Sequence, residues 1–120
     1  MGIVYFGNYS VYMDVGRMDY LSHLDLNRAD WPVKDLAPGA VVASHLSFHS
    51  PARYNDLIDI HVRIAELGRS SYTFHVLFTR GEAHTPLATG RLTLVWLDDA
   101  FKVIPMPQDF RRPIQTFEEL

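Results

Sequence analysis

Residues 2–21 read GIVYFGNYSVYMDVGRMDYL, and this stretch decides how the rest of the chain must fold. A glycine turn leads to Asn8, a residue type that caps helices because its side chain accepts hydrogen bonds from the free amides of the first turn. Apolar residues then recur at helical spacing, which predicts a helix from about Asn8 to His23. A narrow polar stripe consists of Ser10, Asp14 and Arg17. The helix is otherwise apolar nearly all round, so we expect it to be mostly buried.

The apolar residues of this helix fall on two faces. One face carries Tyr9, Tyr12, Met13, Gly16, Tyr20 and Leu24, and the other carries Val11, Val15 and Met18. A chain of 120 residues can bury such a helix only by wrapping a sheet around it.

Four stretches after the helix predict such a sheet. They run from about Ala40 to His49, Leu57 to Glu66, Ser71 to Arg80 and Leu87 to Leu97. The second is the clearest, because apolar residues at 58, 60, 62 and 64 alternate with polar residues at 59, 61 and 63. Breaker residues mark a connector over 26–38 and turns at 67–70 and 98–99. Residues 101–104 are expected to extend the strand pairing, and a short helical tail is expected from Asp109 onward. The order of elements indicates an α+β fold.

Composition narrows the class of protein. The length fits a single domain over residues 1–120, and 48% hydrophobic residues are enough for one core. A net charge of −3 gives no electrostatic footprint for nucleic acid. The absence of cysteine excludes disulfides, thiolate metal sites and a cysteine nucleophile, and it favours a reducing compartment. No apolar run reaches the ~20 residues of a membrane span, and no signal peptide is visible. We therefore expect a cytoplasmic protein.

Six histidines raise the question of a metal site. His45 and His49 share one face of a predicted strand, and we expect His61 on a neighbouring strand. No helical HxxxH pattern is present, and the spacing shows no further carboxylate to orient the histidines. Outward-facing histidines at a dimer contact are therefore the expectation, with no metal and no cofactor.

Several segments together resemble a known family. They are residues 2–9 with the helix after them, residues 47–58, the turn at 68–71, and residues 104–107 followed by Asp109-Phe110-Arg111. They resemble the hotdog-fold thioesterases of the 4-hydroxybenzoyl-CoA thioesterase type, which include acyl-CoA thioesterases associated with the Tol-Pal system. The resemblance covers nearly the whole chain.

The resemblance implies a fold and an activity. The fold would be an antiparallel sheet wrapped around one long central helix, assembled into homodimers or homotetramers. The activity would be hydrolysis of an acyl- or aroyl-CoA thioester. Charge on the thioester oxygen would be stabilised by the backbone amides of Phe6 and Gly7 at the helix start, with Asn8 holding the turn.

The family's catalytic aspartate lies three residues before the glycine that matches Gly2. Only Met1 precedes Gly2 here, so we expect this aspartate, with the N-terminal strand that carries it, upstream of Met1. The competing interpretation is a short chain that has lost or relocated the chemistry.

Other site residues each have two interpretations. Asp14 is the nearest carboxylate to Asn8 and is a candidate for catalysis or for lining the acyl pocket; the alternative is an ion pair with Arg17. An aromatic acyl pocket would be lined by Tyr9, Tyr12, Met13 and Tyr20, which serve equally as core residues.

The resemblance also places CoA phosphate contacts at Arg69, Ser70 and Ser71, where the alternative is a solvated hairpin turn. Arg53 is a further phosphate candidate.

Three functions remain open from the sequence. The first is an acyl-CoA hydrolase. The second is a non-catalytic hotdog protein that binds acyl-CoA or an acyl carrier without the catalytic carboxylate. The third is a purely structural oligomerisation module.

Overall fold

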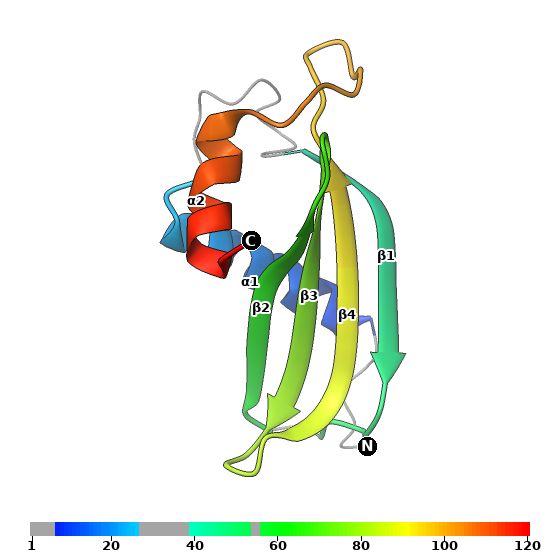
Figure 1. Cartoon of the computed structure of the whole chain (residues 1–120). Helices are drawn as coiled ribbons and strands as arrows, with labels where there is room; N and C mark the ends of the chain where they lie inside the picture. Colours follow the sequence, from blue (N-terminus) through cyan, green and yellow to red (C-terminus); the bar gives the residue numbers. More distant parts are fainter. Residues whose placement is uncertain (1–6, 27–38, 54–55) are drawn as a thin grey trace.

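The computed structural model describes residues 7–26, 39–53 and 56–120. In this part of the chain the elements are α1 (Asn8–His23), β1 (Ala40–Phe48), β2 (Ile58–Leu67), β3 (Ser71–Arg80), β4 (Thr85–Val95) and α2 (Gln108–Glu118). The strands form one antiparallel sheet in the order β1-β4-β3-β2 (Figure 1). The α+β class is therefore confirmed, and α1 has the bounds expected from the sequence.

The alternating pattern of the strands sorts their side chains onto two faces of the sheet. The inner face of β3 carries Tyr72, Phe74, Val76 and Phe78, each at most 3% exposed. Leu92, Leu94 and Trp96 extend the same core from β4 and the segment after it. Side chains of a strand alternate between faces, so the outer face receives the polar residues between them.

Helix α1 packs across the inner face of the sheet, and two glycines let it approach closely (Figure 1). A Cβ atom at Gly16 would lie 2.7 Å from a methyl group of Val62 and 3.0 Å from one of Ile60. A Cβ atom at Gly90 would lie 2.6 Å from the sulfur of Met13. The buried residues of α1 are Tyr9, Met13, Gly16, Tyr20 and Leu21.

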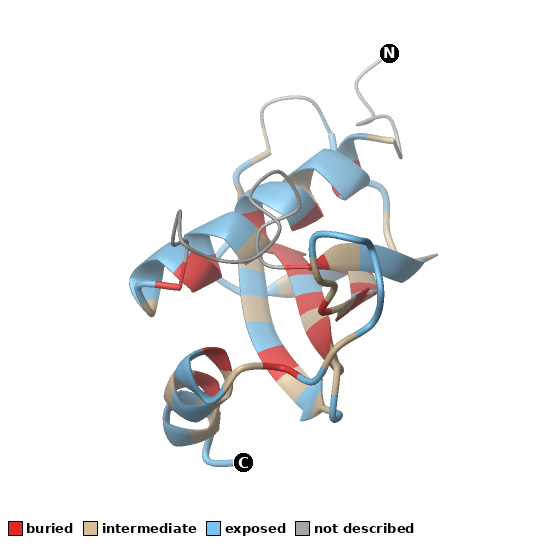
Figure 2. Ribbon diagram, turned by 90° about the horizontal axis from the view of Figure 1, so that it is seen from above, coloured by how far each residue is buried: buried red, intermediate tan, exposed pale blue. Residues whose placement is uncertain are grey.

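The opposite side of α1 is exposed, which corrects the expectation of a helix buried nearly all round (Figure 2). Val11 and Val15 are each 58% exposed, and Met18 is 40% exposed. A single four-stranded sheet has one inner face, so it covers one side of the helix rather than wrapping it. In this chain α1 is a helix on a sheet and not a fully enclosed central helix.

Helix α2 closes the end of the core near the C-terminal half of α1 (Figure 1). The ring centroid of Phe110 lies 4.9 Å from that of Tyr72 and 5.2 Å from that of Trp96. The Glu118 carboxylate accepts hydrogen bonds from the Tyr20 hydroxyl at 2.7 Å and from the Ile64 backbone amide at 2.9 Å. The expected helical tail is confirmed. Residues 102–104 pair with residues 96–98 through an antiparallel bridge between Leu97 and Val103 and through two backbone hydrogen bonds, so the expected extension of the strand pairing is present as a short bridge.

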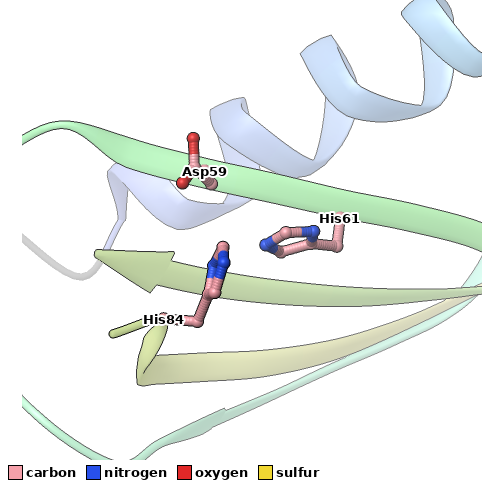
Figure 3. A group of neighbouring side chains, drawn as sticks. All are labelled: Asp59, His61 and His84. Carbon is pink, nitrogen blue, oxygen red and sulfur yellow. The ribbon is translucent and has the colours of Figure 1, made fainter. Parts of the chain in front are cut away.

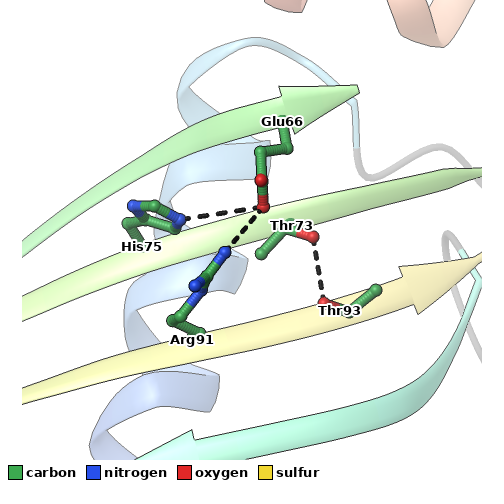
Figure 4. Close-up of polar contacts among 5 residues, drawn as sticks. All are labelled: Glu66, Thr73, His75, Arg91 and Thr93. Carbon is green, nitrogen blue, oxygen red and sulfur yellow. Dashed lines mark hydrogen bonds and ion pairs between the residues drawn. The ribbon is translucent and has the colours of Figure 1, made fainter. Parts of the chain in front are cut away.

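The outer face of the sheet is polar at its centre (Figure 4). Arg91 donates to the Glu66 carboxylate at 3.0 Å, and His75 lies 3.9 Å from the same carboxylate. Beside them the hydroxyls of Thr73 and Thr93 share a hydrogen bond of 2.9 Å. These contacts link β2, β3 and β4 on a face that no element of the described chain covers.

Candidate functional site

Four aromatic rings gather where α1 begins on the inner face of the sheet. Tyr9 packs edge-on against Phe78 of β3 and Phe48 of β1, with distances between ring centroids of 5.0 Å and 5.3 Å. Tyr12, one turn along the helix, lies 5.8 Å from Tyr9. Edge-to-face contacts of this length are favourable and hold the rings in fixed orientations. The expectation that Tyr9, Tyr12 and Met13 lie together on the inner side of the helix is consistent with this packing.

The hydroxyl of Tyr9 is the unusual atom in this cluster. It is buried and has no hydrogen-bond partner among the described residues. Burial raises the pKa of the Tyr9 phenol, and the neighbouring Tyr12 and Asp56 act in the same direction. Buried polar groups nearly always have a partner, so this neutral O–H is a donor in position to meet an added ligand or water.

A polar loop lies at the same end of the sheet. Asp56 accepts the backbone amide of Arg53 at 2.7 Å, and Arg80 lies 3.5 Å from the Asp56 carboxylate. Arg80 also donates to the carbonyl of Pro51 at 3.1 Å. Asp56 and Arg80 line a hollow of about 460 Å³ together with Leu57 and the β3–β4 turn. Arg53, a predicted phosphate contact, is exposed at this end.

The helix start itself is only partly described. Phe6 lies outside the described residues, so the structure is silent on its amide. Gly7 occupies the capping position, with φ −61° and ψ −24°, and no side chain caps the helix there. The expectation that Asn8 is the cap is therefore wrong: Asn8 is the first helical residue and its side chain is exposed.

Asp14 lies on the outer side of α1. It accepts a hydrogen bond from Arg17 at 3.2 Å, and its side chain is 63% exposed. The ion-pair interpretation of Asp14 is thus confirmed. In this chain the carboxylate points away from the side of α1 that buries Tyr9 and Met13.

The predicted CoA contacts of the central hairpin lie at the other end of the molecule. The backbone carbonyls of Arg69 and Ser70 accept from Met106 and Trp96, and Gly68 donates to the Ser71 carbonyl at 2.7 Å. Arg111 donates to the Gly68 carbonyl, which ties the hairpin to α2. Strand β3 has ten residues, so its two ends are about 30 Å apart. One chain therefore does not bring Arg69, Ser70 and Ser71 to the start of α1.

The histidines are more dispersed than expected. His45 contacts Ser47 and His49 contacts Thr89, whereas His61 contacts Thr79. His61 is on β2, which is at the opposite edge of the sheet from β1, so the expectation that it neighbours the strand of His45 and His49 is wrong. Strand order depends on long-range pairing, which spacing along the sequence does not reveal.

Several residues of this end of the molecule were missed by sequence reasoning. They are Phe48, Asp56, Phe78 and Arg80, which the sequence analysis gave no role at the site. A usable signal existed for Asp56, because it stands three residues after Arg53, the spacing at which an acidic side chain can reach back to a backbone amide. Nothing in the sequence indicates that Phe48 and Phe78 meet at Tyr9.

Comparison with known proteins identifies a family that the chain matches. The model of the thioesterase superfamily matches residues 1–87. A Bacillus subtilis (strain 168) protein provisionally named an acyl-CoA thioesterase is 33% identical over 85 residues. That match spans 68% of this chain and 60% of the relative, so the chain spans less than two thirds of the relative's length.

Two solved structures superpose on nearly the whole of this chain. A Thermus thermophilus thioesterase, crystallised with coenzyme A and zinc, superposes with a TM-score of 0.82 at 25% identity, over 99% of this chain and 84% of that one. A gentisyl-coenzyme A thioesterase superposes with a TM-score of 0.75 at 25% identity, over 92% of this chain and 87% of that one. The sheet and helices thus have a hotdog-like α+β arrangement. Among the described residues, neither helix is long or apolar enough to cross a membrane.

Proposed function

The chain belongs to the thioesterase superfamily, and on this basis we propose that it hydrolyses an acyl-CoA thioester. Water adds to the thioester carbonyl, the carbon–sulfur bond breaks, and the products are a carboxylic acid and the CoA thiol. The names of the Bacillus subtilis relative and of the Thermus thermophilus and gentisyl-CoA enzymes support a CoA thioester as the substrate class.

The observation that carries the proposal is the position of the Tyr9 hydroxyl. It is a buried donor without a partner among the described residues, beside the start of a helix and inside an aromatic cluster. An acyl group fits against such rings, and charge that develops on the thioester oxygen is stabilised by donors already in place. The amides of Phe6 and Gly7 would act from the helix start, where the helix dipole has its positive end.

The carboxylate that activates water or attacks the carbonyl is the open element of this site. Asp14 remains the candidate from the helix, although its ion pair with Arg17 and its exposure favour a role at a contact with a second copy. The CoA moiety would be held by Arg53 at the same end and by Arg69, Ser70 and Ser71 from the hairpin of another copy, since the hairpin of the same chain is too distant. We therefore infer a homodimer or homotetramer in the cytoplasm, with residues 1–120 as one domain.

The test is hydrolysis of a panel of acyl- and aroyl-CoA substrates, followed as release of the free thiol. We expect turnover by the parent chain and about a tenfold lower kcat/KM for Tyr9→Phe, which keeps the ring and removes one hydrogen bond of ~1.4 kcal/mol. Tyr20→Phe is the matched control, because it removes a phenol hydroxyl from the same helix far from the cluster and should leave kcat/KM unchanged below its melting temperature.

The same experiment separates the alternatives. If no thioester is hydrolysed but acyl-CoA raises the melting temperature, the non-catalytic binding function replaces the proposal. If acyl-CoA neither reacts nor stabilises the fold, only a structural module remains. Equal kcat/KM for the parent and Tyr9→Phe would remove the aromatic cluster from the site while leaving the activity itself standing.

A further inference from the structure

Three potential metal ligands meet on the outer face of the sheet, at the end where β3 turns into β4 (Figure 3). They are the carboxylate of Asp59, the imidazole of His61 and the imidazole of His84, and one ligand atom from each lies within 4.8 Å of the others. Asp59 and His61 are two residues apart on β2 and therefore project from the same face of the strand. His84 belongs to the turn between β3 and β4.

We propose that Asp59, His61 and His84 bind one divalent transition-metal ion of the zinc type. Two imidazoles and one carboxylate form a ligand set that suits Zn²⁺ and leave a coordination position for water. Zinc–ligand bonds of about 2 Å place the ligand atoms of a tetrahedral site roughly 3.3 Å apart. All three side chains are exposed at their tips, so small rotations of their side-chain torsions close the remaining gap from 4.8 Å.

The surroundings of His61 favour a ligand role. Its Nε2 atom contacts the hydroxyl of Thr79 at 3.0 Å, and Thr79 is 1% exposed. This contact orients the imidazole, and Figure 3 shows that the ring nitrogen farther from the backbone, Nε2, faces His84. A metal ion would therefore take the place of the Thr79 hydroxyl as the partner of Nε2. The ring of His84 lies 5.9 Å from that of His61, centroid to centroid.

The other two ligands are free for the same purpose within the described residues. Neither the Asp59 carboxylate nor the His84 imidazole has a hydrogen bond or ion pair there. His84 holds a left-handed backbone conformation, with φ 51°, which directs its side chain from the tight turn toward β2. A hollow of about 460 Å³ lined by Asp59, His84 and Glu82 gives an ion access and adds a second carboxylate to its wall.

This site is distinct from the proposed thioester site. The aromatic cluster of Tyr9 is on the inner face of the sheet, whereas Asp59 and His61 project from the outer face. A bound ion would bridge the edge strand β2 and the β3–β4 turn. The proposal therefore stands or fails independently of thioester hydrolysis.

The test is calorimetric titration of chelator-treated protein with Zn²⁺, together with the melting temperature. We expect one Zn²⁺ per chain and a melting temperature that rises with Zn²⁺ concentration, because an ion that binds only the folded state stabilises it. Mg²⁺ should have no effect at the same concentration. In His84→Asn the affinity should fall by about 10–100-fold or more, since losing a mere outer partner of a ligand costs that much. Asparagine tolerates a left-handed conformation, so the turn should persist.

Two further variants make the outcome decisive. Asp59→Asn keeps the shape of the side chain and should also weaken binding, whereas His45→Asn removes an exposed histidine elsewhere and should bind as the parent does. Histidine side-chain NMR resonances of His61 and His84 should shift together on adding Zn²⁺. The proposal is overturned if Zn²⁺ does not bind, or if His84→Asn and His45→Asn bind it equally, which would mark non-specific binding by surface histidines.

Discussion

Tyr20 and Glu118 show how a single contact ties together parts of the chain that are 98 residues apart. One carboxylate oxygen accepts from the Tyr20 hydroxyl of α1 and from the Ile64 amide of β2, so α2 is attached to both elements at once. Residue Ile64 stands at an irregularity in the β2–β3 register, where a strand amide needs a partner other than the neighbouring strand. Glu118 supplies that partner.

This contact predicts that the free energy of unfolding falls at alkaline pH. Burial raises the pKa of the Tyr20 phenol above its ordinary value of 10.0, and the hydrogen bond to Glu118 and its charge raise it further. Above about pH 10 the unfolded phenol loses its proton while the folded one keeps it, so the free energy of unfolding falls as pH rises; below pH 10 this stabilisation is complete. We expect Tyr20→Phe to cost about 1–3 kcal/mol at pH 7, with a smaller difference from the parent at pH 11. Urea unfolding of the parent and the variant at pH 7 and at pH 11 measures this difference in the free energy of unfolding.

A second variant identifies the source of the effect. Glu118→Gln keeps an oxygen acceptor for Tyr20 and Ile64 but removes the charge, so its alkaline loss of stability should lie between those of the parent and Tyr20→Phe. If Tyr20→Phe loses stability above pH 10 as steeply as the parent, the Tyr20 phenol does not cause the alkaline dependence.

At the scale of single elements, local pattern was a reliable guide. The helix over 8–23 and the strand over 71–80 have the predicted bounds, because their apolar periodicity is long and unbroken. The alternation of β2 at residues 58–64 also holds, with exposed residues at 59, 61 and 63. The pattern did not show which of the two apolar faces of α1 is buried. Val11 and Met13 look equally apolar in sequence, and only the glycine at position 16 marks the side that approaches the sheet.

Gly16 therefore predicts how tightly α1 is held against β2. Alanine is a better helix former than glycine by ~1 kcal/mol, so Gly16→Ala on an open surface would stabilise the helix. Here the added methyl group would lie 2.7 Å from Val62, and overpacking of this kind costs about 1–3 kcal/mol. We expect a net loss of roughly 1 kcal/mol, measured as a lower midpoint in urea unfolding.

The cause can be isolated by removing the obstruction. Val62→Ala in the Gly16→Ala background takes away the contacting methyl groups, so the two changes together should cost less than the sum of the single changes. Asp19→Ala, on the exposed side of α1, should change stability by no more than about 0.5 kcal/mol. Simple additivity of the two substitutions, or a stabilising Gly16→Ala, would contradict the close packing.

At the scale of the whole molecule, the arrangement depends on facts that spacing along the chain does not contain. The order β1-β4-β3-β2 separates His61 from His45 and His49 and brings Phe48 and Phe78 together at Tyr9. It also places the central hairpin and the start of α1 at opposite ends of β3. The sequence therefore placed Tyr9 and Met13 on one side of α1, whereas the contacts of Tyr9 with Phe48 and Phe78 required long-range strand pairing. In the proposal above, the contacts with CoA also require a second copy of the chain.

We expect the second copy of the chain to contact the exposed side of α1. Val11 and Val15 are each 58% exposed one turn apart, and Met18 continues the stripe. These three side chains follow one side of the helix, and contiguous apolar surface of this kind is what a protein–protein contact buries. We expect Val15→Lys to convert the assembled protein to monomers, since a lysine ammonium would have to be buried without a partner at the contact. Light scattering coupled to gel filtration measures the mass directly.

Val103→Lys is the matched control for this change. Val103 is 61% exposed, like Val15, but it lies in the segment between β4 and α2, so its substitution should leave the assembled mass unchanged. Val103→Lys should unfold in urea within about 0.5 kcal/mol of the parent, because it alters a surface side chain away from the contact. Val15→Lys should be less stable than the parent, because it also loses the stabilisation that association gives the folded state. A parent chain that is monomeric at high concentration, or a Val15→Lys variant that keeps the parent's mass, would remove α1 from the contact. A monomeric parent would also remove residues 69–71 from CoA binding, because within one chain they are too far from the site at Tyr9.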